Sequence, residues 1–245
     1  EHLGFDCIEW IYEVYGEKEN PLFSQEGVLK IRQLSSQYNV GIFSICADYF
    51  MEKPFIRVSQ EEVDRNISIL ESLMKIGRQI GANRIVIPFV DNSSINTSEE
   101  FWNVITILKR CLNIAEDNKI EIHLETSLTP IRFSDLLWHL PHPLLKVNYD
   151  SGNSASLGYS PKEEFSLYGD RIGSFHVKDR LFGDGTVPLG TGNTDFASLS
   201  ECVNKINYKG DFILQAARGE EGDEAPWSEK NLDFVLTNFY SNRSK

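Results

Sequence analysis

The chain has 245 residues, a mass of 27.9 kDa and a formal net charge of −12 at pH 7. This length can bury a sizeable core, and no linker or change of composition divides it, so we expect one domain over residues 1–245. The negative charge argues against nucleic acid and anionic membranes as partners. No apolar run approaches the roughly 20 residues that span a bilayer, which excludes a transmembrane helix.

The cysteine pattern indicates the redox compartment. Cys7, Cys46, Cys111 and Cys202 show no CxxC spacing, and three of them lie in apolar surroundings. This usage favours reduced, buried thiols in a cytoplasmic protein. Cys46 differs because it falls near the end of a predicted strand, where it could line a pocket instead of filling the core.

Predicted strands and helices alternate along the whole chain. The first residues resemble the tail of a helix that stops at Gly4, so we expect the chain to begin inside a longer native protein. Two capping boxes, Ser59–Glu62 and Thr97–Glu100, open the two longest predicted helices. The predicted strands are 5–10, 40–46, 82–90, 120–126, 145–150, 172–177 and 211–217. The predicted helices are 24–39, 59–81, 97–118, 133–139, 160–168, 195–206 and a last one from Ser228.

This alternation predicts a parallel α/β fold. Apolar, β-branched residues occupy both faces of the strands, as they do in a sheet that is buried on both sides. An eight-stranded (β/α) barrel, or TIM barrel, with its first strand missing from this chain fits the pattern, and so does an open doubly wound sheet. Polar residues at the ends of several strands favour the barrel, because its strand ends converge on one mouth.

Each of the last four predicted strands carries a polar residue that could bind a metal, at or near its end. These residues are Glu125, Asp150, His176 and Gln215. Polar side chains inside a parallel sheet are costly unless they bind a metal, pair with one another or line a wet pocket. Glu, Asp and His together suit one divalent ion such as Mn²⁺, Co²⁺ or Zn²⁺, with Mg²⁺ as a further candidate. A metal-free network of satisfied polar side chains is the alternative.

The segments HLETS, NYDSGN, FHVKDR and VPLGTGNTDF carry a resemblance to a known family. Together they resemble the sugar phosphate isomerase/epimerase group with the xylose isomerase-like barrel, which includes ketose 3-epimerases and L-ribulose-5-phosphate 3-epimerases. The resemblance implies that Glu125, Asp150 and His176 are metal ligands and that Glu125 is also the catalytic base. The substrate would then be a small sugar or sugar phosphate, and proton transfer would pass through an enediolate.

The fourth ligand position departs from the family pattern, because Gln215 stands where the pattern has a second Glu. An amide oxygen can still bind a cation, but it brings no charge and cannot act as a base. The sequence therefore leaves three functions open. The first is an isomerase or epimerase with Glu125 as base, where Gln215 favours one-base aldose–ketose isomerisation over symmetrical two-base epimerisation. The others are a dehydratase of a polyol or keto-sugar and a catalytically inactive sugar-binding barrel.

Further residues are predicted to contact a carbohydrate substrate. Lys178, Arg180 and Arg218 are cations in the loops after the last strands, where barrels commonly bind phosphate. The other predicted substrate-binding residues are Glu9, Cys46 and Asn153, each at or just after a strand end. Related barrels often pair, so a homo-oligomer is compatible with the resemblance.

Overall fold

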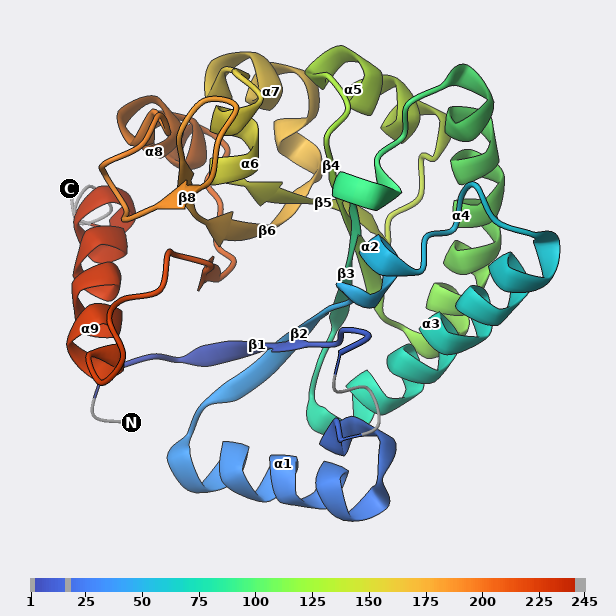
Figure 1. Cartoon of the computed structure of the whole chain (residues 1–245), viewed down its shortest axis with the longest axis horizontal. Helices are drawn as coiled ribbons and strands as arrows, with labels where there is room; N and C mark the ends of the chain where they lie inside the picture. Colours follow the sequence, from blue (N-terminus) through green and yellow to red (C-terminus); the bar gives the residue numbers. More distant parts are fainter. Residues whose placement is uncertain (1–2, 16–18, 241–245) are drawn as a thin grey trace. The chain divides into compact units, whose positions relative to one another are not determined.

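The computed structural model describes residues 3–15 and 19–240. These residues divide into two compact units, the first holding residues 6–15, 19–128 and 132–146 and the second holding residues 3–5, 129–131 and 147–240. Parallel strands alternate with helices in both units, as predicted (Figure 1). The predicted helical tail includes residues 1 and 2, which lie outside the described residues. The single-domain interpretation of the chain stays a prediction.

Four parallel strands organise the first unit. They are β1 (Cys7–Ile11), β2 (Gly41–Cys46), β3 (Arg84–Phe89) and β4 (Glu121–Thr126), paired in chain order. The connecting elements are η1 (Pro21–Phe23), α1 (Gln25–Tyr38), α2 (Tyr49–Glu52), α3 (Gln60–Ile80), η2 (Asp91–Ser93) and α4 (Ser98–Asn118). Every residue of β3 is buried, including Arg84 at its start, and the apolar run from Ile85 to Phe89 matches this burial.

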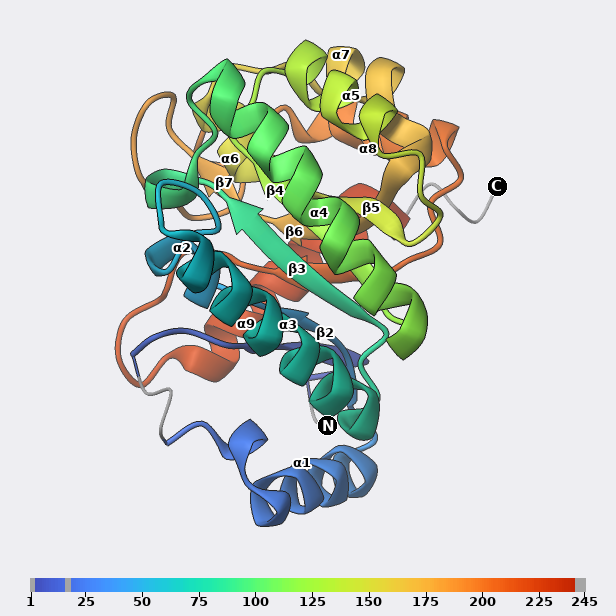
Figure 2. The ribbon, with the colours of Figure 1, turned by 90° about the vertical axis from the view of Figure 1, so that its right-hand side faces the viewer.

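Both predicted capping boxes are present in the first unit. The Ser59 side chain accepts from the Glu62 backbone N–H while Glu62 reaches back to the Ser59 N–H, and Thr97 and Glu100 form the same pair. These contacts satisfy N–H groups that would have no partner in the first turn. The two helices then run alongside β3 with their apolar stripes turned inward (Figure 2).

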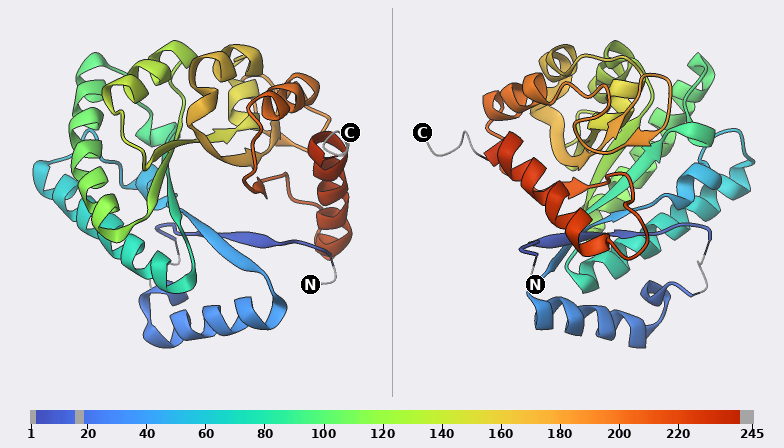
Figure 3. Two further views of the ribbon diagram at one scale, coloured as in Figure 1. Left: turned by 180° about the vertical axis from the view of Figure 1, so that it is seen from behind. Right: turned by 60° about the vertical axis from the view of Figure 1, so that its left-hand side comes forward.

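Three parallel strands organise the second unit. They are β5 (Leu145–Asp150), whose first two residues belong to the first unit, β6 (Ile172–Val177) and β9 (Phe212–Leu214). A short antiparallel hairpin, β7 (Asp179–Arg180) with β8 (Thr186–Val187), follows β6. The helical elements are α6 (Ser151–Ser156), α7 (Pro161–Tyr168), η3 (Gly169–Arg171), α8 (Phe196–Lys205), α9 (Glu224–Val235) and η4 (Leu236–Tyr240). Figure 3 shows α9 in red and α8 in orange-brown among the helices of this unit.

Aromatic side chains pack against one another in the core of the second unit. Phe175 of β6 is fully buried and its ring contacts Tyr149, Tyr208 and Phe212 at centroid separations of 5.4, 4.7 and 5.2 Å. Such tilted and edge-on pairs add to the hydrophobic gain of burial. The packing fixes β5, β6 and β9 relative to one another, and these are the strands that carry the polar residues of the second unit.

The structure corrects several predicted boundaries. Helix α6 begins directly after Asp150, where the Ser-Gly-Asn segment predicted a turn, because the Asp150 carboxylate caps the helix. Helix α5 (Pro130–His139) starts at Pro130 instead of Phe133, since proline suits a first helical turn. Helix α9 likewise starts before Ser228. Strand β9 ends at Leu214, shorter than the predicted 211–217.

Candidate functional site

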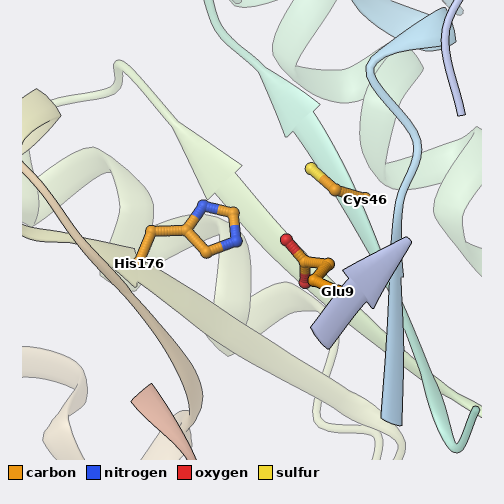
Figure 4. Close-up of side chains that lie close together, drawn as sticks. All are labelled: Glu9, Cys46 and His176. Carbon is orange, nitrogen blue, oxygen red and sulfur yellow. The ribbon is translucent and has the colours of Figure 1, made fainter. Parts of the chain in front are cut away.

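In the first unit, three predicted site residues come from different strands. Glu125 lies near the end of β4 and is 7% exposed, while Cys46 ends β2 and is 1% exposed. Glu9 lies on β1, which is the neighbour of β2, and is half-buried. Figure 4 shows the Glu9 and Cys46 side chains on these two strands and labels His176 of β6. Within this unit, two carboxylates therefore lie close enough to the Cys46 thiol to act on its charge.

The electrostatic surroundings of Cys46 determine its state. Burial raises the pKa of this thiol well above its ordinary value, and the carboxylates of Glu9, Asp48 and Glu125 raise it further. The thiol donates a hydrogen bond to Asp48 Oδ1 at 3.1 Å. A raised pKa favours the neutral thiol over the thiolate, which is the reactive form of cysteine, so the structure does not favour a nucleophilic role for Cys46.

In the second unit, Asp150 and His176 are neighbours across the pairing of β5 and β6. They are 5% and 0% exposed, and residues directly opposite each other in paired strands present their side chains on the same face. One carboxylate oxygen of Asp150 accepts from the Asn153 N–H at 2.8 Å and so caps α6. A buried carboxylate beside a buried imidazole is a donor pair that suits a divalent ion of intermediate hardness.

Lys178 connects two of the predicted ligands in the second unit. Its ammonium lies 3.5 Å from Asp150 Oδ2 and donates to Gln215 Oε1 at 2.9 Å. Gln215 follows β9 directly, and its backbone N–H continues the strand pairing by donating to the Val177 carbonyl at 3.1 Å. The amide oxygen that was predicted to bind metal therefore already accepts a charged hydrogen bond.

Two of the predicted substrate-binding residues contact each other. Arg180 Nη1 donates to Asn153 Oδ1 at 2.8 Å, and Arg180 Nε donates to the Asp184 carbonyl at 3.0 Å. The start of α6 and the β7–β8 hairpin are joined by these contacts. Arg218 lies beyond β9 and is exposed.

Asp179 is a residue whose importance the sequence did not reveal. This carboxylate is 1% exposed and accepts the backbone N–H groups of Gly190, Gly192 and Thr194 at 2.9, 2.8 and 3.1 Å. A Cβ on Gly192 would collide with the Asp179 carboxylate. Asp179 therefore determines the shape of the Gly-rich loop before α8. An acidic residue shortly before such a loop was the available signal, but acidic residues in loops are usually solvated.

Comparison with known proteins identifies the family. A family model described as the xylose isomerase-like TIM barrel matches residues 1–237, so the chain belongs to this family. The predicted barrel class and the resemblance drawn from the sequence motifs are confirmed. No helix among the described residues is long and apolar enough to cross a membrane.

Curated relatives with similar sequences are named as epimerases. The chain is 22% identical over 249 residues to a putative L-ribulose-5-phosphate 3-epimerase of Haemophilus influenzae. It is 24% identical over 250 residues to a putative L-ribulose-5-phosphate 3-epimerase of Escherichia coli. Each alignment covers 95% of this chain and 83% of the relative.

Solved structures of low sequence identity share the fold. The IOLI protein with a zinc atom matches at a TM-score of 0.80 and 15% identity, covering 97% of this chain and 90% of that one. An L-ribulose 3-epimerase matches at a TM-score of 0.78 and 14% identity, covering 99% of this chain and 86% of that one. At these identities the likeness establishes the fold alone.

Proposed function

We propose that this barrel is a metal-dependent isomerase or epimerase of a small sugar or sugar phosphate. The observation that carries the proposal is the buried Asp150–His176 pair on adjacent strands, in a chain whose curated relatives are named as L-ribulose-5-phosphate 3-epimerases. Burying a carboxylate and an imidazole together is costly, and a bound cation offsets that cost. The zinc atom named for the IOLI protein, a structural neighbour, supports the same cofactor class.

Glu125, Asp150 and His176 would hold the ion, and Glu125 would also be the general base. The chemistry of this donor set, two carboxylates and one imidazole, fits Mn²⁺, Co²⁺, Zn²⁺ or Mg²⁺. A divalent ion bound there would polarise the substrate carbonyl and acidify the adjacent C–H bond. The predicted role of Gln215 as a fourth ligand stays a prediction, because its amide oxygen accepts from Lys178 in this structure.

The chain's own residues would then move one proton. The Glu125 carboxylate removes the proton from the carbon beside the carbonyl and returns it to the former carbonyl carbon while the hydroxyl proton moves to the other oxygen, which gives aldose–ketose isomerisation; epimerisation would need a proton delivered to the opposite face of the first carbon. Burial of Glu125 at 7% exposure limits water near that step. Arg180 and Asn153 are already joined by a hydrogen bond and would orient hydroxyl or phosphate oxygens of the substrate.

Metal analysis combined with hydrogen exchange tests the proposal. The purified protein is loaded in turn with each of the four ions, and the metal content is measured. The metal-loaded protein is then incubated with pentuloses, hexuloses and their phosphates in deuterated water. We expect one bound ion per chain and incorporation of deuterium at the carbon next to the carbonyl. A protein that binds none of the four ions and exchanges no hydrogen would rule out the proposed enzyme.

A matched pair of variants on β4 locates the base. Glu125→Gln should lower the exchange rate by about 10²-fold or more, as expected for loss of a general base. Glu121→Gln is the control, because Glu121 lies on the same strand but pairs with His123 at 2.8 Å. Equal losses in both variants would contradict the role of Glu125. An ultraviolet-absorbing enone product without isomer formation would instead indicate the dehydratase.

The cytoplasmic location also remains part of the proposal. All four cysteines are free thiols in the structure, and three of them are buried. Reduced thiols of this kind suit a reducing compartment. The oligomeric state is a separate prediction, which sedimentation of the purified protein would decide.

A further inference from the structure

Lys178 of the second unit makes hydrogen bonds through both its main chain and its side chain. Its backbone N–H donates to Ser151 Oγ at 3.0 Å, and the Ser151 hydroxyl donates to the Lys178 carbonyl at 2.6 Å. Thr194 Oγ1 also donates to that carbonyl at 3.3 Å. These hydrogen bonds fix the main chain of Lys178 against the start of α6, independently of the contacts that its side chain makes.

The aliphatic part of the Lys178 side chain packs against the start of α6. It lies over Gly152, where an added Cβ would come within 2.7 Å of Lys178 Cγ and 2.9 Å of Lys178 Cβ. A larger residue at position 152 would force the lysine aside. Only 17% of the Lys178 side chain is exposed, and its ammonium reaches both Asp150 and Gln215. Ordering a long lysine side chain costs rotamer entropy, which these contacts offset.

We propose that Gln215 is a positioning residue for Lys178, and that the Lys178 ammonium hydrogen-bonds an oxygen of the bound sugar and stabilises the negative charge that develops on it. This inference rests on the proposed function, since it assigns Lys178 a role in that same site. The chemical class of the ligand is the oxyanion that forms when a proton leaves the carbon beside a sugar carbonyl.

The amide is the suitable partner for this task. Gln215 accepts a hydrogen bond and so directs the ammonium, but it is neutral and adds no second negative charge to the Asp150 carboxylate that already lies 3.5 Å from Lys178 Nζ. A carboxylate at the same position would form an ion pair and reduce the field that the ammonium exerts on a substrate oxygen. Gln215 thus directs the charge of Lys178 without neutralising it.

Three substitutions separate this role from a metal-ligand role of Gln215. Lys178→Met removes the charge, Gln215→Met removes the acceptor, and Gln215→Glu replaces the amide with a carboxylate of the same shape. Each variant is titrated with Mn²⁺ by calorimetry in the absence of sugar, and deuterium exchange is then measured with the metal-loaded protein. Lys162→Met serves as the control, because Lys162 is an exposed lysine of α7 that pairs with Glu201 at 3.4 Å.

The expected pattern differs between the two measurements. Lys178→Met should lower the exchange rate by about 10²-fold, the loss typical of one oxyanion donor. It should also tighten Mn²⁺ binding by up to about tenfold, because outer contacts of a ligand tune metal affinity and the ammonium competes for Asp150. Gln215→Met should lower exchange by about tenfold, the usual cost of losing one hydrogen bond. Gln215→Glu should leave Mn²⁺ affinity within about threefold of wild type, because Lys178 pairs with the new carboxylate.

Two results would overturn the inference while leaving the proposed function intact. One is wild-type exchange in Lys178→Met with Mn²⁺ still bound. The other is a tenfold or larger gain of Mn²⁺ affinity in Gln215→Glu with Lys178 unchanged, which would mean that this position faces the metal. Absence of Mn²⁺ binding and exchange in the wild-type protein would overturn the proposed function itself, and this inference with it.

Discussion

Replacing Asp179 with Asn should destabilise the protein strongly although it changes one atom of a buried side chain. Oδ2 of Asp179 accepts two backbone N–H groups, from Gly190 and Gly192, and Oδ1 accepts a third from Thr194. An asparagine can keep its oxygen toward the two glycines. Its NH₂ group then faces the Thr194 N–H, so that two donors meet and no hydrogen bond forms.

The magnitude follows from counting these bonds. A hydrogen bond to a charged group contributes about 1.5–3 kcal/mol, and one such bond is lost outright. The other two become bonds to a neutral amide and weaken by roughly half. We expect the free energy of unfolding to fall by about 3–6 kcal/mol. That is a large part of the roughly 5–15 kcal/mol typical of a whole domain.

Urea unfolding followed by tryptophan fluorescence measures this loss. Asp184→Asn is the control, because Asp184 lies in the same connecting region but is exposed, and its carboxylate accepts the N–H of the neighbouring Gly185. We expect the control to change the free energy of unfolding by no more than about 0.5 kcal/mol. Amide hydrogen exchange should also become faster at Gly190, Gly192 and Thr194 in Asp179→Asn.

The reasoning about Asp179 would be refuted by one combination of results. If Asp179→Asn unfolds at the same urea concentration as wild type and its loop amides exchange no faster, the three hydrogen bonds do not hold the loop. A loss of stability without faster exchange at these three amides would place the effect elsewhere in the second unit.

Three further predictions concern the first unit. Because the pKa of Cys46 is raised, iodoacetamide at pH 8 should modify this thiol far more slowly in the folded protein than in urea, and equal rates would contradict its burial among carboxylates. The same shift contributes stability that is present below the ordinary thiol pKa of about 9 and is lost as pH rises through the raised value, so Cys46→Ala should show a smaller loss of stability above pH 9. Ser59→Ala removes the cap of α3 and should cost about 1 kcal/mol of unfolding free energy by urea titration, whereas Ser72→Ala, within the same helix, should cost less.

Much of the fold follows from local sequence signals. The Ser59 and Thr97 capping boxes stand where the predicted helices begin, and strands β5 and β6 have their predicted bounds. These signals are local because caps and strand periodicity depend on residues a few positions apart. The start of α6 was predicted wrongly because it depends on capping by Asp150, a carboxylate that was assigned to metal binding.

The candidate site was also predicted from the sequence only in part. The sequence by itself identified Glu125, Asp150 and His176 as polar residues in buried strands, because alternation along a strand shows which side chains share a face. Only the tertiary structure joined Lys178 to Gln215, 37 residues along the chain. It also revealed that Asp179 organises a loop and that carboxylates from several elements surround Cys46. Such pairings depend on how separate elements pack, and no local pattern encodes the distance between side chains that far apart.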